Sequence, residues 1–192
     1  RWHSVTGVQT CALPICFVPE GPEVSEPEWR NVLAALEQVG DGWLIASGSL
    51  PRGVPEDMYA RVAAIARRQG MHFVLDSSHE ALKAALGHGV DLVKPSLGEL
   101  EWLVGRKLPT RQEREAEAQR LVREGAAGMV VVTLGGDGAF LALPDRVVHL
   151  PALEGPVLSA VGAGDAFLAS LVLALSRGAT PDDALAWGIA AG

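Results

Sequence analysis

From residue 44 onward, short strand-like runs alternate with helical patterns, and this alternation is the strongest constraint on the fold. Apolar or β-branched runs predict strands at 44–47, 72–76, 91–94 and 129–133. Helical spacing predicts helices between these strands and after them, at 55–70, 79–86, 96–104, 111–124, 163–177 and 181–191. Strands and helices in this order form right-handed βαβ units. We therefore expect an α/β fold of three layers, α/β/α, with a mainly parallel sheet.

The pattern changes after Leu134. The turn Gly135-Gly136-Asp137-Gly138 separates two strand-like runs, and residues 146–150 add a third. Glycine-rich turns of this kind join antiparallel strands. We expect an antiparallel edge there.

Composition limits the class of protein. The chain has 192 residues, of which 48% are hydrophobic and 20% charged, which fits one globular domain. The longest nearly apolar run, 166–175, is broken by Ser170 and is shorter than the ~18 residues of a membrane span. The net charge is −7, without a cluster of Lys and Arg, so neither a membrane nor nucleic acid is an expected partner.

The first sixteen residues differ from the rest. The run from Val5 to Ile15 resembles the translation of a common sequencing-library adapter, and we exclude residues 1–16 from the fold as an artefact. The alternatives are a natural N-terminal strand or a signal peptide, although no apolar core of a signal is present. Both cysteines, Cys11 and Cys16, lie here, and a body without cysteine suits the cytoplasm. The start without Met and the end inside a helical pattern predict a gene fragment cut at both ends.

Polar residues follow four predicted strands. They are Ser47 with Ser49, Asp76, Lys94 and Thr133. Ligands of open α/β sheets bind beyond the carboxyl ends of the strands. These residues predict a site for a polar small molecule.

The segment 159–167 carries the most information. Gly162, Ala163 and Gly164 precede a long apolar helix, and small residues there let backbone N–H groups approach an anion. Asp165 could then accept a proton from a hydroxyl beside a phosphate. Alternatively, the glycines form only a tight turn and Asp165 only favours the helix start.

Two further motifs allow both a structural and a functional interpretation. The turn 135–138 is a good hairpin, but glycine turns also bind phosphates. Ser96 and Glu99 have the spacing of a capping box, while Glu99 could also lie near a nucleotide-bound Mg²⁺, with Lys94 adding positive charge. The five histidines lack metal-ligand spacing, and a P-loop and a dinucleotide fingerprint are absent from the sequence.

Taken together, 161–165, 134–138 and Lys94-Pro95 resemble the motifs of the ribokinase/PfkB carbohydrate kinases, over about 17–192. Within this family, Ser47-Gly48-Ser49-Leu50-Pro51 and 75–78 are most similar to the branch of minor 6-phosphofructokinases and 1-phosphofructokinases. The resemblance implies a ribokinase-like fold and ATP-dependent phosphorylation of a ketose phosphate: fructose 6-phosphate or fructose 1-phosphate would become fructose 1,6-bisphosphate.

The resemblance also implies roles for individual residues. Asp165 matches the catalytic base, which also contacts the substrate, and Gly162, Ala163 and Gly164 match the anion hole. Ser49 matches a contact to the sugar phosphate. The remaining matches are nucleotide contacts at Lys94, Ser96, Thr133, Gly135 and Gly138, a carboxylate near Mg²⁺ at Glu99, and a K⁺ site at Ser159 and Val161.

The sequence also departs from the family. Ser96 stands where the family's Asn-x-x-Glu motif has Asn, which puts nucleotide and metal contacts on that side in question. The N-terminal sugar-binding part and the β lid have no counterpart, so we expect the parent protein, a homodimer, to be the active kinase and this chain to be inactive. The alternatives are a kinase of the same fold for an unphosphorylated sugar or nucleoside, and a non-catalytic nucleotide-binding module.

Overall fold

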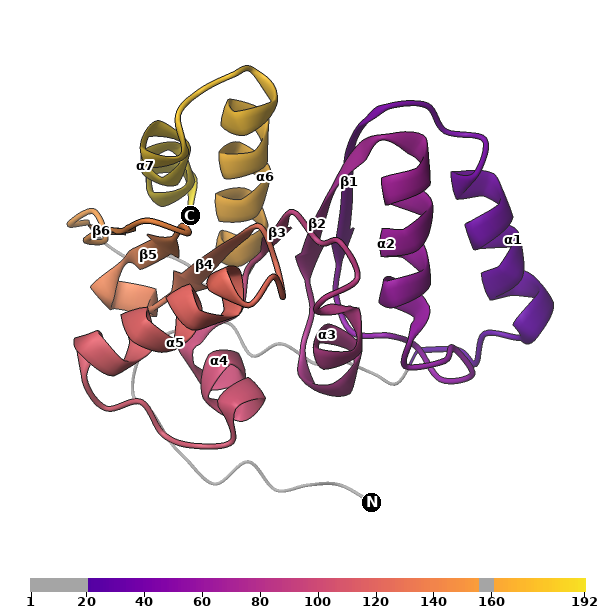
Figure 1. Ribbon diagram of the computed structural model, residues 1–192, viewed down its shortest axis with the longest axis horizontal. Helices are drawn as coiled ribbons and strands as arrows, with labels where there is room; N and C mark the ends of the chain where they lie inside the picture. The colour runs from indigo at the N-terminus through magenta and orange to yellow at the C-terminus, as the bar shows by residue number, and fades with distance from the viewer. Residues whose placement is uncertain (1–20, 156–160) are drawn as a thin grey trace.

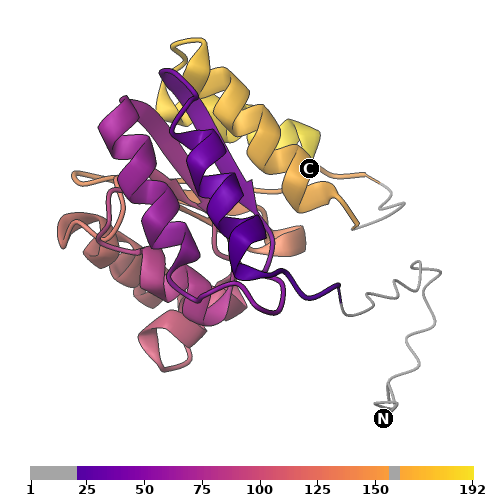
Figure 2. The same cartoon turned by 90° about the vertical axis from the view of Figure 1, so that its right-hand side faces the viewer.

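The computed structural model describes residues 21–155 and 161–192 (Figures 1 and 2). Within these stretches, six strands form one sheet in the order β1-β2-β3-β4-β5-β6. Strands β1 to β4 run parallel, and β4, β5 and β6 pair antiparallel. The strands are β1 (Gly42–Ser47), β2 (Met71–Asp76), β3 (Leu92–Val93), β4 (Met129–Thr133), β5 (Ala139–Ala142) and β6 (Val147–Leu150). The predicted parallel sheet with an antiparallel edge is confirmed.

Helices cover both faces of this sheet. On one face lie α1 (Glu26–Leu36), α2 (Met58–Gln69), α3 (His79–Ala85), α4 (Leu97–Val104) and α5 (Arg111–Arg123). On the other face lie α6 (Ala163–Ser176) and α7 (Pro181–Ala191), as Figure 1 shows around β4 and β5. Figure 2 shows α6 across the sheet from α2. The predicted three-layer α/β/α architecture is therefore confirmed.

The period-two pattern of the strands builds two separate cores. In β2, Phe73 and Leu75 pack with the layer of α1 to α5, whereas Val74 between them packs with α6 and α7. All three side chains are fully buried. Alternation with no polar face is typical of a parallel sheet covered on both sides.

The sequence prediction missed one helix, and several boundaries differ by a few residues. Helix α1 was not predicted, although Ser25 and Glu28 form a capping pair at its start. Helix α2 begins at Met58 rather than at Pro55, and it ends as predicted at Gly70, which has φ +72°. Strand β3 is limited to Leu92 and Val93, so Lys94 lies just beyond it.

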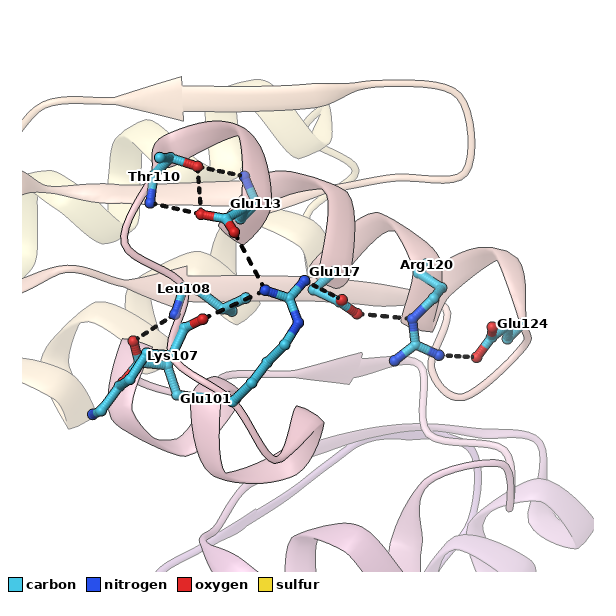
Figure 3. A network of polar contacts seen from close by, with 9 residues as sticks. Glu101, Lys107, Leu108, Thr110, Glu113, Glu117, Arg120 and Glu124 are labelled. Atoms are coloured by element: carbon cyan, nitrogen blue, oxygen red, sulfur yellow. Dashed lines mark hydrogen bonds and ion pairs between the residues drawn. The ribbon is translucent and has the colours of Figure 1, made fainter.

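Ion pairs and caps order the connection from α4 to α5 (Figure 3). The Glu101 carboxylate accepts hydrogen bonds from the Leu108 backbone N–H, at 2.9 Å, and from Lys107 Nζ, at 2.7 Å. Thr110 and Glu113 form a capping box at the start of α5. The hydrogen bonds from Leu108 and Lys107 lower the pKa of Glu101, and the Leu108 N–H has the larger effect.

In the part of the chain that the structure describes, none of the helices is both long and apolar enough to cross a membrane.

Candidate active site

The carboxyl ends of the parallel strands bring the predicted polar residues together. Ser47 and Asp76 are register partners at the ends of β1 and β2. Ser96, three residues after β3, forms a bridge with Thr133, the last residue of β4. Parallel strands present their carboxyl ends at one edge, and this edge is where the sequence placed the site.

A buried ion pair lies at this edge. Lys94 Nζ is 3.0 Å from Asp76 Oδ2, and the two side chains are 8% and 17% exposed. Burial raises the pKa of Asp76, Lys94 opposes this effect, and the negative charges of Glu99 and Asp165 add to it. Asp76 therefore interacts electrostatically with one lysine and with two other carboxylates.

The N-terminus of α6 faces the same edge. Gly162, with φ +83°, is the N-cap of α6, and Ala163, Gly164 and Asp165 form its first turn. A side chain at Gly164 would place its Cβ 3.6 Å from Lys94 Nζ, so the lysine lies against this helix end. Gly162 occupies the cap position, so Asp165 lies in the first turn, where a negative charge favours the helix start and where its side chain can also make other contacts.

Asp165 borders an open hollow. Ser47 Oγ donates a long hydrogen bond of 3.5 Å to Asp165 Oδ1. The hollow has a volume of about 300 Å³ and is lined by Ile45, Ser47, Asp165, Leu168 and Ala169. Its polar end therefore carries the carboxylate that the sequence proposes as a base.

Glu99 takes part in the predicted capping box. The Ser96 backbone N–H donates to Glu99 Oε2 at 2.7 Å, and the Glu99 N–H donates to Ser96 Oγ at 3.3 Å. Ser96 is thus the N-cap of α4. Among residues 21–155 and 161–192, no group of three or more His, Cys, Asp or Glu side chains is arranged to hold a metal ion.

The two outer glycines of the turn 135–138 have different surroundings. Gly138 has φ +91°, and a Cβ there would come within 2.2 Å of the Leu150 carbonyl oxygen. Gly135 has φ +60°, but a Cβ there would meet no atom within 4 Å. Close backbone packing therefore explains Gly138, whereas the space beside Gly135 is open to a ligand.

The remaining predicted residues lie at the margins of this arrangement. Ser49 is exposed in the loop after β1. Val161 is 62% exposed just before Gly162. Ser159 and residues 1–16 lie outside the described residues.

Sequence reasoning missed two residues behind the loop that carries Ser49. Tyr59 and Ser77 are buried, and both donate hydrogen bonds to the Gly48 carbonyl oxygen. No motif marks Tyr59. Ser77 lies in the segment 75–78 that resembles the phosphofructokinase branch, but no role was predicted for it.

A doubly covered parallel sheet with a lysine, a carboxylate and a glycine-led helix N-terminus at its carboxyl edge is an arrangement that α/β domains use to bind phosphate groups. The model of the pfkB family of carbohydrate kinases matches residues 17–192. The chain belongs to this family, as its motifs predicted.

Individual relatives agree with the predicted branch. The chain is 39% identical over 178 residues to the ATP-dependent 6-phosphofructokinase isozyme 2 of Mycobacterium tuberculosis, a match covering 92% of this chain and 52% of the relative. It is 39% identical over 146 residues to the 1-phosphofructokinase of Rhodobacter capsulatus, covering 76% and 46%. The crystal structure of phosphofructokinase-2 from Escherichia coli in complex with fructose-6-phosphate superposes with a TM-score of 0.84 and 35% identity, covering 91% and 57%. The chain thus spans about half the length of these relatives.

Proposed function

We propose that the complete protein transfers a phosphoryl group from ATP to a hydroxyl of a phosphorylated ketose, forming a ketose bisphosphate such as fructose 1,6-bisphosphate. The observation that carries this proposal is the position of Asp165. It lies in the first turn of α6, directly after the small residues 162–164 in the sequence, and it lines the hollow. The phosphofructokinase relatives support the substrate class.

The residues at this edge divide the work of phosphoryl transfer. Asp165 would accept the proton of the attacking sugar hydroxyl. The backbone N–H groups at the start of α6, together with Lys94, would meet the negative charge of the transferred group. Catalysis of this kind depends on positioning and on charge, because the transition state is loose.

The charge at the edge fits a nucleotide bound with a cation. Lys94 is paired with Asp76, and Glu99 and Asp165 add negative charge near them. Phosphates alone would be repelled by this surplus of carboxylates, and a divalent ion would supply the missing positive charge. Glu99 is the residue that we propose near Mg²⁺, with Lys94, Thr133 and Gly135 toward the nucleotide. We also propose that K⁺ binds near Val161. The complete protein would be a cytoplasmic dimer that acts in glycolysis.

The test is an assay of ADP release by the complete reading frame with ATP and Mg²⁺. The acceptors are fructose 6-phosphate, fructose 1-phosphate, fructose and a nucleoside. We expect turnover with a phosphorylated ketose. Turnover only with fructose or the nucleoside would overturn the substrate class, and ATP binding without turnover of any acceptor would favour a non-catalytic nucleotide-binding module. We expect this chain alone to be inactive.

A further inference from the structure

Gly48 is held by hydrogen bonds at both its backbone N–H and its carbonyl oxygen. The Gly48 N–H donates to the Asp76 carbonyl oxygen at 2.8 Å. Its carbonyl oxygen accepts from Tyr59 Oη at 2.9 Å and from Ser77 Oγ at 3.0 Å. A carbonyl oxygen has two lone pairs, so these two hydroxyls fill its capacity.

Both donors are buried side chains in rigid elements. Tyr59 is 9% exposed on α2, and Ser77 is 5% exposed directly after β2. Burial raises the pKa of Tyr59 above its ordinary value, which keeps the phenol protonated and able to donate. Gly48 itself has φ +106°, a conformation that favours glycine and that these contacts help to maintain.

The far end of the same loop is also anchored. The Val24 N–H donates to the Arg52 carbonyl oxygen at 2.8 Å. Gly53 has φ +84°, and a Cβ there would lie 2.2 Å from the Val24 carbonyl oxygen. The loop 48–53 is therefore fixed at both ends, while Ser49 within it is exposed.

We propose that Tyr59 and Ser77 are positioning residues for the sugar phosphate, acting through the Gly48 peptide. A peptide group is planar, so fixing the Gly48 carbonyl also fixes the direction of the Ser49 N–H. The two buried hydroxyls would hold Ser49 in the place where it meets the phosphate of the acceptor. This inference rests on the proposed function and on the contact between Ser49 and the sugar phosphate that the family resemblance implies.

The first test needs no activity and uses this chain. Tyr59→Phe removes one donor and leaves the ring in place. In a ¹H–¹⁵N spectrum, we expect the Ser49 amide signal to shift and its hydrogen exchange to become faster. An unchanged Ser49 amide in both Tyr59→Phe and Ser77→Ala would overturn the inference, whatever the protein catalyses.

The second test uses the complete protein. Tyr59→Phe and Ser77→Ala should each raise KM for the ketose phosphate about 2–10-fold, as expected for one lost hydrogen bond, while KM for ATP stays within about 2-fold. Ser77→Thr, which keeps the hydroxyl, should restore the KM. The matched control is Val62→Ala, a buried position on α2 that should lower Tm without changing either KM.

The outcomes separate the two proposals. An active protein in which both KM values rise together, or in which only Tm falls, would overturn the positioning role and leave the kinase proposal intact. A protein that shows no phosphoryl transfer would overturn the proposed function, and with it the link from Ser49 to a sugar phosphate.

Discussion

Lys94 and Asp76 join neighbouring strand ends through a buried ion pair, with 3.0 Å between Nζ and Oδ2. A lysine that is 8% exposed needs a nearby opposite charge, because removing one partner from a buried pair leaves the other charge uncompensated. The pair also keeps the lysine charge at the start of α6, where a Cβ on Gly164 would lie 3.6 Å from Nζ. The same two side chains therefore bear on stability and on the proposed phosphate binding.

Asp76→Asn should change how stability depends on pH. Burial, the largest effect on Asp76, raises its pKa above the ordinary value of 3.8. As the pH falls through this raised pKa toward 3.8, the folded state binds a proton that the unfolded state does not, so this group adds stability. Asn cannot titrate, so the variant lacks this gain in stability at low pH.

The measurement is urea unfolding of this chain and its Asp76→Asn variant at pH 7 and at pH 4, close to the ordinary pKa of 3.8. We expect the parent to gain stability relative to the variant at the lower pH. Parallel changes of the two unfolding free energies with pH would show that Asp76 has an unperturbed carboxyl group.

Glu99→Gln separates the helix cap from the proposed role near Mg²⁺. Gln keeps most of the capping hydrogen bond to the Ser96 N–H and loses the charge. In the complete protein, we expect the Mg²⁺ concentration for half-maximal activity to rise about 10-fold or more.

Glu113→Gln is the matched control for this experiment. Glu113 makes the same capping box with Thr110 at the start of α5, in the network of Figure 3. Glu113 also pairs with Arg106 at 3.4 Å, so its substitution should lower stability at least as much as Glu99→Gln does, while it leaves the Mg²⁺ dependence unchanged. Equal Mg²⁺ dependence in the two variants would reduce Glu99 to a cap.

The sequence predicted the sheet and the edge at which the site lies, because period-two apolar runs and polar strand ends are local signals. It did not predict α1, whose start at Ser25 lies before the first strand. Nor did it find Tyr59 and Ser77, whose hydrogen bonds to Gly48 form only when α2 and β2 pack beside the loop. The pairing of Lys94 with Asp76 likewise depends on strand register, which no motif encodes.

Substitutions of Gly135 and Gly138 should differ sharply. Gly138→Ala combines a positive φ with a Cβ 2.2 Å from the Leu150 carbonyl oxygen, so we expect a loss of more than about 2 kcal/mol in unfolding free energy. Gly135→Ala has only the positive φ and should cost about 1–2 kcal/mol. Because its Cβ would fill the open space, it should also weaken ATP binding to the complete protein. Urea unfolding and a nucleotide titration check both; unweakened ATP binding by Gly135→Ala would remove Gly135 from the nucleotide site.

Removing residues 1–16 should leave the fold unchanged, because they resemble adapter-derived sequence and show neither helical nor strand periodicity. Thermal melting of a chain that begins at Phe17, beside the whole chain, provides the measurement. A clearly lower Tm of the shorter chain would show that these residues stabilise the domain.

Asp165→Asn tests the proposed chemistry directly. The structure places Asp165 in the first turn of α6 but not at its cap, so Asn removes the charge and keeps the shape. A positioned base contributes about 10²–10⁴-fold to a rate, and kcat of the complete protein should fall by about that factor. Stability should fall by no more than about 1 kcal/mol, the value of one acidic side chain at a helix N-terminus.

Nucleotide affinity should survive this substitution, because the backbone N–H groups at 162–164 and the Lys94 side chain remain. ATP affinity, kcat and Tm are therefore measured together on the parent and on Asp165→Asn. A kcat within a few-fold of the parent would mean that Asp165 serves only the helix start. A loss of ATP affinity as large as the loss of kcat would make Asp165 part of the nucleotide site, and the base would have to be sought elsewhere around the hollow.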